Sequence, residues 1–204
     1  MAKPDFDSRR PRDRGAATIA ARGLAIAIAA TLALACAGAA HAGGHAAFAA
    51  RAGLDLATAA ARSWAADASL IYLENDEDVD ASGAAERWGY LYYSPAAQRC
   101  RAYSVRDGRI LEAENLEMKF EAPPVADGWI DSGTAIEVAE RGAGHAFKQQ
   151  HGGRLSTMLL MRGAFDETTP DRTTWTLVYT APNQPSLFVV VDASEGKVRR
   201  TWRG

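Results

Sequence analysis

The chain has 204 residues, 48% of them hydrophobic, and a formal net charge of −2. The first 42 residues hold six basic and three acidic side chains, and the rest of the chain holds 17 basic and 22 acidic ones. Contacts to phosphate need clustered Lys and Arg, so this acidic remainder argues against nucleic acid as a partner.

The first 42 residues have the features of an export signal. Basic residues precede an uncharged apolar run from Leu24 to Ala40, and Ala40-His41-Ala42 has the small-x-small pattern of a signal peptidase site. We therefore expect a signal peptide at 1–42, cleaved after Ala42, and a periplasmic or secreted protein. Two alternatives stay open: the run could be retained as a membrane anchor, or Cys36 could carry a lipid.

After the leader, residue patterns predict a helix and then four strands. An Ala-rich stretch at 47–66 suits a helix, and Asp55 as N-cap would place its firm part at 56–66. A solvated acidic loop is expected at 75–86. The strands are expected at 69–74, 88–93, 99–105 and 110–120.

A second series follows the Pro- and Gly-containing segment 123–128, which stops both helix and strand. Asp131 is expected to cap a helix that is interrupted or ended near Gly142 and Gly144. The strands of this series are expected at 156–161, 175–180, 186–192 and 197–202.

The two series share a motif. Trp88-Gly-Tyr-Leu-Tyr92-Tyr-Ser-Pro95 reappears as Trp175-Thr-Leu-Val-Tyr179-Thr-Ala-Pro182, with Trp, Tyr and Pro at the same offsets. An internal repeat is typical of a chain built from copies of one unit. We therefore predict an α+β fold of two repeats, each a helix packed on an antiparallel sheet, with Trp88 and Trp175 in the core. The first repeat is expected at 43–122, a linker at 123–128 and the second repeat at 129–204.

The end of the chain resembles a known family. It reads Trp175-Thr-Leu-Val-Tyr179 and then Leu187-Phe-Val-Val-Val-Asp192-Ala193-Ser-Glu-Gly196-Lys-Val198. This Trp-led strand, a β-branched strand ending in Asp-Ala and a Gly turn resemble the end of PepSY and PepSY-like domains. The resemblance implies a cystatin-like fold without common catalytic residues. We interpret Asp192 and Gly196 as turn residues: Asp accepts backbone hydrogen bonds, and Gly permits a positive φ.

The resemblance also implies a function class. Some PepSY domains lie in peptidase propeptides, where they are thought to inhibit or chaperone the enzyme. The chain is therefore expected to be an exported, non-catalytic binding module whose partner is an exported protein of the peptidase class. An alternative is a carrier that holds a small or lipophilic ligand between helix and sheet.

Candidate metal-binding and catalytic residues are few. Asp76, Asp78 and Asp80 have the spacing that begins an EF-hand loop, but Ala81 and Arg87 stand where that loop needs Gly and Glu. The three His residues after the leader lack a zinc-ligand spacing, and no nucleophile elbow is present. We expect no metal, no cofactor and no catalytic residues.

The Cys residues allow no disulfide after cleavage, because only Cys100 then remains. Cys100 aligns with Leu187 in the second copy, so we expect a buried thiol.

A candidate partner-binding surface is carried by four residues of two neighbouring strands. By alternation, Tyr93 lies on the face opposite to Trp88, and three others lie on the face opposite to Cys100. Tyr and Arg are enriched in protein interfaces. The alternative is that both faces are buried, one under the helix and one against the sister unit. The candidate residues are Tyr93, Arg99, Arg101 and Tyr103.

Overall fold

The computed structural model describes residues 45–116, 122–163 and 171–204. Gly43–Gly204 form one compact unit, separate from Met1–Ala42. The predicted signal peptide, its cleavage site and Cys36 lie outside the described residues, as does the end of the strand predicted at 110–120.

β-Strand is the commonest secondary structure of the described chain. In chain order, the elements are β1 (Phe48–Ala49), the 3-10 helix η2 (Ala50–Gly53), α2 (Leu54–Trp64), β2 (Ser69–Asn75), β3 (Ala84–Ala85), β4 (Trp88–Ser94), β5 (Arg99–Arg106), β6 (Arg109–Leu116), α3 (Ser132–Glu140), α4 (Ala143–His151), β7 (Arg154–Arg162), β8 (Thr173–Thr180), β9 (Leu187–Asp192) and β10 (Lys197–Arg203).

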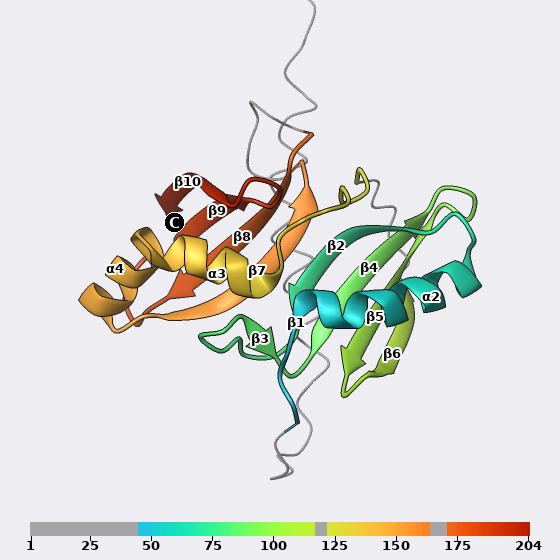
Figure 1. Cartoon of the computed structure of the whole chain (residues 1–204), viewed down its shortest axis with the longest axis horizontal. Helices are drawn as coiled ribbons and strands as arrows, with labels where there is room; N and C mark the ends of the chain where they lie inside the picture. Colours follow the sequence, from blue (N-terminus) through green and yellow to red (C-terminus); the bar gives the residue numbers. More distant parts are fainter. Residues whose placement is uncertain (1–44, 117–121, 164–170) are drawn as a thin grey trace, which may run out of the picture. The chain divides into compact units, whose positions relative to one another are not determined.

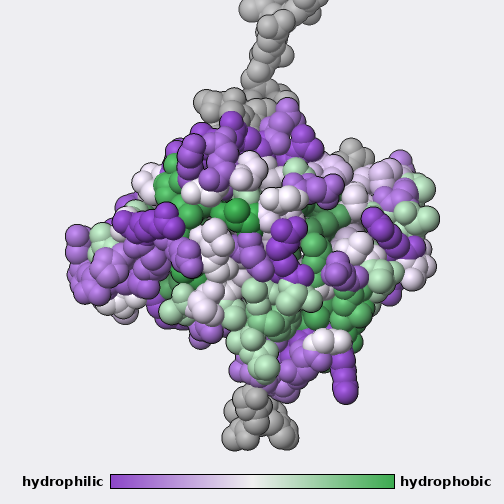
Figure 2. Space-filling model, viewed as in Figure 1, coloured by the Kyte–Doolittle hydropathy of each residue, from purple (hydrophilic) through white to green (hydrophobic). Residues whose placement is uncertain are grey.

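Eight of these strands form a single sheet in the order β10-β9-β8-β7-β2-β4-β5-β6, and β1 and β3 form a small two-stranded sheet. Every neighbouring pair in the large sheet is antiparallel. The helices α2, α3 and α4 all lie on the same side of it (Figure 1). From this side, hydrophilic side chains gather around α4, and hydrophobic patches show between the elements (Figure 2).

The predicted fold class is wrong in its main feature. The strands do not form two helix-on-sheet repeats, because β2 and β7 pair with each other and join all eight into one sheet. The pairing is antiparallel, with Leu73 opposite Leu160 at its middle and Tyr72 and Glu74 opposite Met161 and Leu159.

The composition of β2 and β7 explains this junction. Both contain four consecutive apolar residues, at 70–73 and 158–161. A strand that is apolar at every position has two faces to bury, and this is typical of strands in the middle of a sheet. The alternation of side chains on β4 and β8 predicted their buried aromatic face. The continuous apolar runs on β2 and β7 are the sequence signal for central strands, and the prediction did not use them.

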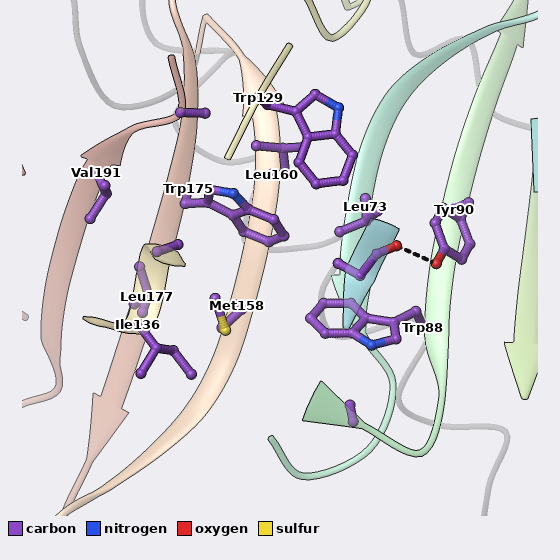
Figure 3. Close-up of a cluster of buried hydrophobic side chains, with 14 of the residues drawn as sticks. Leu73, Trp88, Tyr90, Trp129, Ile136, Met158, Leu160, Trp175, Leu177 and Val191 are labelled. Carbon is purple, nitrogen blue, oxygen red and sulfur yellow. Dashed lines mark hydrogen bonds between the residues drawn. The ribbon is translucent and has the colours of Figure 1, made fainter. Parts of the chain in front are cut away.

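The core on the helix side is aromatic, and it continues across the junction. Trp88 and Trp175 are fully buried, which confirms the prediction for both. Their rings meet edge to face with centroids 6.3 Å apart, and Trp129 packs on Trp175 in the same way at 5.8 Å. Figure 3 shows the three indoles beside Leu73 and Leu160 of the two central strands. Ring contacts of this geometry add to the energy of burial.

The indole N–H groups tie this core to the segments that precede the helices. Trp88 Nε1 donates to Phe48 O and Trp175 Nε1 donates to Ile130 O, each at 2.8 Å. Both segments end where a helix begins, so each Trp fixes the entry of the helix that covers its strand.

The helix starts agree in part with the sequence. Asp131 is the N-cap of α3, and its side chain accepts from Ser132 N, as predicted. The predicted break between α3 and α4 is also present, with Gly142 as N-cap of α4. Asp55 is not a cap, because η2 precedes α2 and moves the N-cap to Gly53.

Candidate functional site: the helix-free face of the sheet

Side chains alternate between the two faces of the sheet, and the register shows which residues share a face. Leu73, Leu160 and Trp175 lie in the core on the helix side. Their neighbours along each strand therefore point to the other side, where no helix of the described ranges packs (Figure 1). We call this side the helix-free face. Its central members are Tyr72, Glu74, Leu91, Ala102, Ser104, Leu159, Met161, Thr174, Thr176 and Val190.

The middle of the helix-free face is apolar. Met161 lies opposite Tyr72 across the central strand pair, and Leu91 lies on the other side of Tyr72. Val190 lies opposite Thr176 on the next strands. In the full chain each of these side chains is less than a tenth exposed. The sheet therefore has apolar side chains in the middle of both faces, although the described helices cover only one.

Glu74 places a carboxyl group within this apolar region. It is 5% exposed, lies opposite Leu159, and accepts a hydrogen bond from the Tyr72 hydroxyl at 2.6 Å. Burial raises the pKa of Glu74 to about 8; the Tyr72 hydrogen bond opposes this rise and the charge of Asp76 adds to it. The carboxyl is therefore mostly protonated at neutral pH and acts as an uncharged hydrogen-bonding group.

A glycine makes room for a second carboxylate beside it. Gly89 lies opposite Glu74, and a Cβ atom there would be 2.9 Å from Asp76 Oδ1. The Asp76 carboxylate accepts from Ser104 Oγ at 2.9 Å and lies 3.6 Å from Arg87 Nε. Burial raises the pKa of Asp76, although Ser104 and Arg87 act to lower it. Asp76 is thus paired with Ser104 and Arg87. Glu74, by contrast, lies among the apolar side chains of this face, opposite Leu159.

Two hydroxyls on this face have no hydrogen-bond partner among the described residues. Thr174 and Thr176 are 1% and 0% exposed, and the Oγ1 atoms of both are unpaired. A buried hydroxyl without a partner costs about 1–3 kcal/mol, and most buried polar groups in folded proteins are paired. These two hydroxyls are therefore positions at which a bound molecule could gain hydrogen bonds.

Asp192 lies on the same face, next to the β9–β10 turn, and is fully saturated. Its Oδ1 accepts from Ser194 N and Glu195 N, each at 2.9 Å. Its Oδ2 accepts from Arg172 Nη1 and from Arg199 Nη2, the latter at 2.9 Å. Burial by itself raises the pKa of Asp192, but these donors outweigh burial and hold the pKa well below its usual range.

This turn confirms two sequence predictions. Asp192 accepts the backbone N–H groups of the turn, and Gly196 has a φ of 63°. Side chains with a Cβ rarely adopt such a φ, so Gly is favoured at this position.

The four predicted partner-binding residues do not share a face. Tyr93 pairs with Cys100 and lies on the helix-free side, whereas Tyr103 pairs with Tyr90 and lies on the helix side. Tyr103 is only 3% exposed, and its hydroxyl donates to Ala60 O of α2 at 3.3 Å.

The two arginines of the set lie near the end of the β4–β5 hairpin. Arg101 pairs with Tyr92 on the helix side, donates to Asn115 Oδ1 at 3.0 Å, and lies 5.9 Å from the ring centroid of Trp64. Arg99 is exposed. Of the four predicted residues, Tyr93 alone therefore belongs to the helix-free face.

The acidic segment 75–86 is not a uniformly solvated loop, because its carboxylates have separate partners. Asp76 is buried, as described above, while Asp78 pairs with Arg154 at 2.8 Å on the surface. Asp80 accepts from Ser82 N at 2.8 Å and Ala84 N at 3.0 Å and so closes a turn. Within the described residues, no group of three or more His, Cys, Asp or Glu side chains is placed to hold a metal ion.

Sequence reasoning missed the residues that distinguish this face. Glu74 ends an apolar run and was assigned to the end of a strand, since its neighbour Leu159 comes from a distant part of the chain. Thr176 was interpreted as an ordinary strand residue, and Thr174 lay just outside the strand predicted at 175–180. Cys100 is fully buried, as predicted.

Comparison with known proteins adds little to this description. No family model matches the chain, and no curated protein matches it. Among solved structures, the chain is similar to a presumed lipoprotein from Clostridium difficile 630, at 14% identity over 74% of this chain and 92% of that one, with a TM-score of 0.48. A TM-score this low supports no inference about function. Within the part of the chain that the structure describes, no helix is long and apolar enough to cross a membrane.

Proposed function

We propose that the chain is an exported, non-catalytic binding protein that presents the helix-free face of its sheet to another exported protein. The observation that carries this proposal is the arrangement of the layers: the described helices lie on one side of the sheet, and the other side has an apolar middle with hydrogen-bonding groups in it. Export rests on the sequence of the leader, with its apolar run and small-residue exit.

The helix side offers less room for a ligand. Five large aromatic side chains fill the space between the helices and the sheet, and each is at most 1% exposed. They are Trp88, Tyr90, Tyr92, Trp175 and Tyr179. A carrier needs an apolar pocket that its own side chains leave unfilled. We therefore favour binding on the opposite face over a ligand held between helix and sheet.

The mechanism we propose is non-covalent. A partner that packs against Leu91, Leu159 and Met161 would gain apolar contacts, and burial of apolar surface is the main favourable term in protein association. Thr174 and Thr176 would gain hydrogen bonds from the partner, and such paired groups fix orientation more than they add affinity. The resemblance of the segment 175–198 to PepSY domains suggests an exported peptidase as the partner class.

The test compares two single substitutions on opposite faces of the same hairpin. Tagged protein of residues 43–204 is used to capture partners from the native exported fraction. Any partner is then purified and titrated by calorimetry against the wild type, Tyr93→Ala and Arg101→Ala. We expect Tyr93→Ala to weaken binding at least about tenfold, as for a central contact residue, and Arg101→Ala to leave it unchanged.

Each outcome is informative once circular dichroism shows that both variants fold. Loss of binding in Arg101→Ala alone would move the interface to the helix side and overturn the proposal. If the partner is a peptidase, its activity and its refolding yield with added protein separate an inhibitor from a chaperone. If no protein is captured and a lipophilic molecule can be extracted from the purified protein, the carrier alternative replaces our proposal.

A further inference from the structure

The two edge strands of the large sheet are long and exposed. β10 and β6 are the outermost strands, with seven and eight residues. Val198 on β10 and Leu111 on β6 are 45% and 49% exposed, which is unusual for large apolar side chains in this structure. The outer backbone groups of an edge strand are a template for pairing with another chain, so long exposed edges require an explanation.

The two edges carry opposite charge. β10 holds Lys197, Arg199, Arg200 and Arg203 and no acidic residue. β6 holds Glu112 and Glu114, with a single basic residue, Arg109, at its start. Arg199 is already paired with Asp192 and Glu195, and Lys197 lies 3.3 Å from Glu195. All four basic side chains contribute to the charge of the β10 edge, and Arg200 and Arg203 lie in its regular part, after the bulge.

Arg200 of β10 and the two glutamates of β6 lie on the same side of the sheet. Arg200 pairs with Val190 and so lies on the helix-free side, where its guanidinium is 5.0 Å from the Trp202 ring centroid. Glu112 pairs with Ser104, and Glu114 pairs with Ala102, so both glutamates lie on that side as well. Side chains that share a face can form cross-strand pairs when two strands meet.

Strand direction also permits the two edges to meet. Seven successive antiparallel pairings separate β10 from β6, so these two strands run in opposite directions. A second copy placed beside the first without turning it over therefore brings its β10 antiparallel to the first copy's β6. The helix-free faces of the two copies stay on the same side, and the sheet continues with its ordinary alternation.

We propose that copies of this protein associate head to tail, with β10 of one copy added to β6 of the next. Symmetric pairing is disfavoured at both edges, because β10 against β10 opposes arginines and β6 against β6 opposes glutamates. Pairing of β10 with β6 instead sets Arg200 against Glu112 or Glu114. A head-to-tail contact of this kind does not close on itself, so the assembly grows as a twisted ribbon.

Each edge also has a bulge, which limits the contact. The register shifts at Leu111 in β6 and at Arg199 in β10. Bulges and charges protect edge strands from indiscriminate pairing. Regular strand remains at 112–116 and at 200–203, which is enough for a short ladder between edges of opposite charge. The association is therefore expected to be weak and sensitive to salt.

The test is a charge-reversal exchange measured by sedimentation velocity on the unit Gly43–Gly204. One variant, Glu112→Lys/Glu114→Lys, makes both edges basic; the other, Arg200→Glu/Arg203→Glu, makes the regular segment 200–203 of β10 acidic, like β6. We expect the wild type to associate with rising concentration at low salt and to dissociate at about 0.5 M salt. Each variant alone should associate at least about tenfold more weakly. Mixing the two variants should restore association, because each basic edge again finds an acidic one.

A matched control tests charge reversal away from both edges. Glu137→Lys/Arg141→Glu changes two exposed residues of α3 and its C-cap, away from both edges, and should leave association unchanged. Thermal unfolding is first used to show that every variant folds. The proposal is overturned if the wild type stays monomeric at low salt, or if the mixture of variants associates no better than each variant alone.

Discussion

Two buried carboxyl groups on the same face of the sheet behave in opposite ways. Glu74 on the central strand β2 is 5% exposed, and its pKa is raised to about 8. Asp192 on β9 is fully buried, yet its pKa lies well below the usual range. Burial raises the pKa of both. The difference between them therefore comes from their partners.

The number and charge of the donors decide the outcome. Glu74 accepts a hydrogen bond from the uncharged Tyr72 hydroxyl, whereas Asp192 accepts from two backbone N–H groups, the Ser194 hydroxyl and two guanidinium groups. Charge-assisted hydrogen bonds stabilise an ionised carboxylate more strongly than neutral ones. Asp192 is thus a structural anion that fixes the β9–β10 turn, and Glu74 is a neutral polar group in an apolar surface.

Removing the charge of Asp192 should have the largest effect. Asp192→Asn keeps a turn acceptor but loses the ion pairs with Arg172 and Arg199, and we expect the free energy of unfolding at pH 7 to fall by about 2–3 kcal/mol. Urea unfolding measures it. Asp171→Asn, at an exposed ion pair with Arg162, is the matched control and should change stability by less than about 0.5 kcal/mol.

The pH dependence of stability under acidic conditions provides a second test of Asp192→Asn. Because the folded-state pKa of Asp192 is lowered, its contribution is present above the unfolded-state pKa of about 3.9 and is lost as pH falls below it. Wild type should therefore lose more stability than Asp192→Asn between about pH 4 and pH 2. Parallel losses in the two proteins would mean that Asp192 is not held as an anion.

Glu74→Gln should have the next largest effect, with the opposite sign. The folded-state pKa of about 8 lies above the unfolded-state value. Over the interval from about pH 4.3 to pH 8 the folded protein holds a proton that the unfolded chain has released, so wild-type stability falls as pH rises through it. Glu74→Gln should equal wild type at about pH 5 and exceed it by about 1–3 kcal/mol at about pH 8.5.

An exposed glutamate provides the comparison for this variant. Glu137→Gln on α3 should leave the pH profile of unfolding unchanged, because the Glu137 side chain is 71% exposed. If wild type and Glu74→Gln kept the same difference at both pH values, Glu74 would be ionised in the folded protein, and the description of the face as uncharged would fail.

The two arginines around Asp192 should show a smaller, coupled effect. The side chains of Arg172 and Arg199 are 35% and 31% exposed, and both donate to Asp192 and Glu195. Each single change to Ala should cost less than Asp192→Asn, because solvent screens the partly exposed guanidinium groups. The double variant should lose more stability than the sum of the two single variants. After one substitution Asp192 still has one guanidinium partner, and after both it has none. An additive double-mutant cycle would contradict this shared role.

The sequence predicted the interactions between residues that are close along the chain, and it did not predict those between distant residues. The turn role of Asp192 was predicted, since Ser194, Glu195 and Gly196 follow it directly. Its pairing with Arg172 was not, because that residue lies 20 positions earlier in the chain, just before the neighbouring strand β8. The burial of Trp88 and Trp175 followed from strand alternation, which is a local pattern, and the burial of Cys100 followed from its alignment with Leu187.

The wrong part of the fold prediction has the same origin. Internal similarity between the two halves suggested separate helix-on-sheet units, and it said nothing about how the first strand of each half would pair. The apolar run at 70–73 did carry a signal for a central strand, but Glu74 was interpreted only as the end of a short strand before a solvated loop at 75–86. The register that places Tyr93 and Tyr103 on opposite faces is likewise a long-range property.

The smallest expected effect tests the single hydrogen bond of Glu74 directly. The Tyr72 hydroxyl stabilises the ionised carboxylate more than the neutral acid, so it acts to lower the Glu74 pKa. Tyr72→Phe should therefore raise that pKa further, while the free energy of unfolding changes by less than about 1 kcal/mol. Carbon-detected NMR titration of the Glu74 carboxyl measures the shift. Tyr92→Phe, which removes a hydroxyl 2.7 Å from Thr58 on the helix side, should leave the Glu74 pKa unchanged. A lower pKa in Tyr72→Phe would mean that the tyrosine stabilises the protonated acid, and the contrast with Asp192 would then rest on burial rather than on donors.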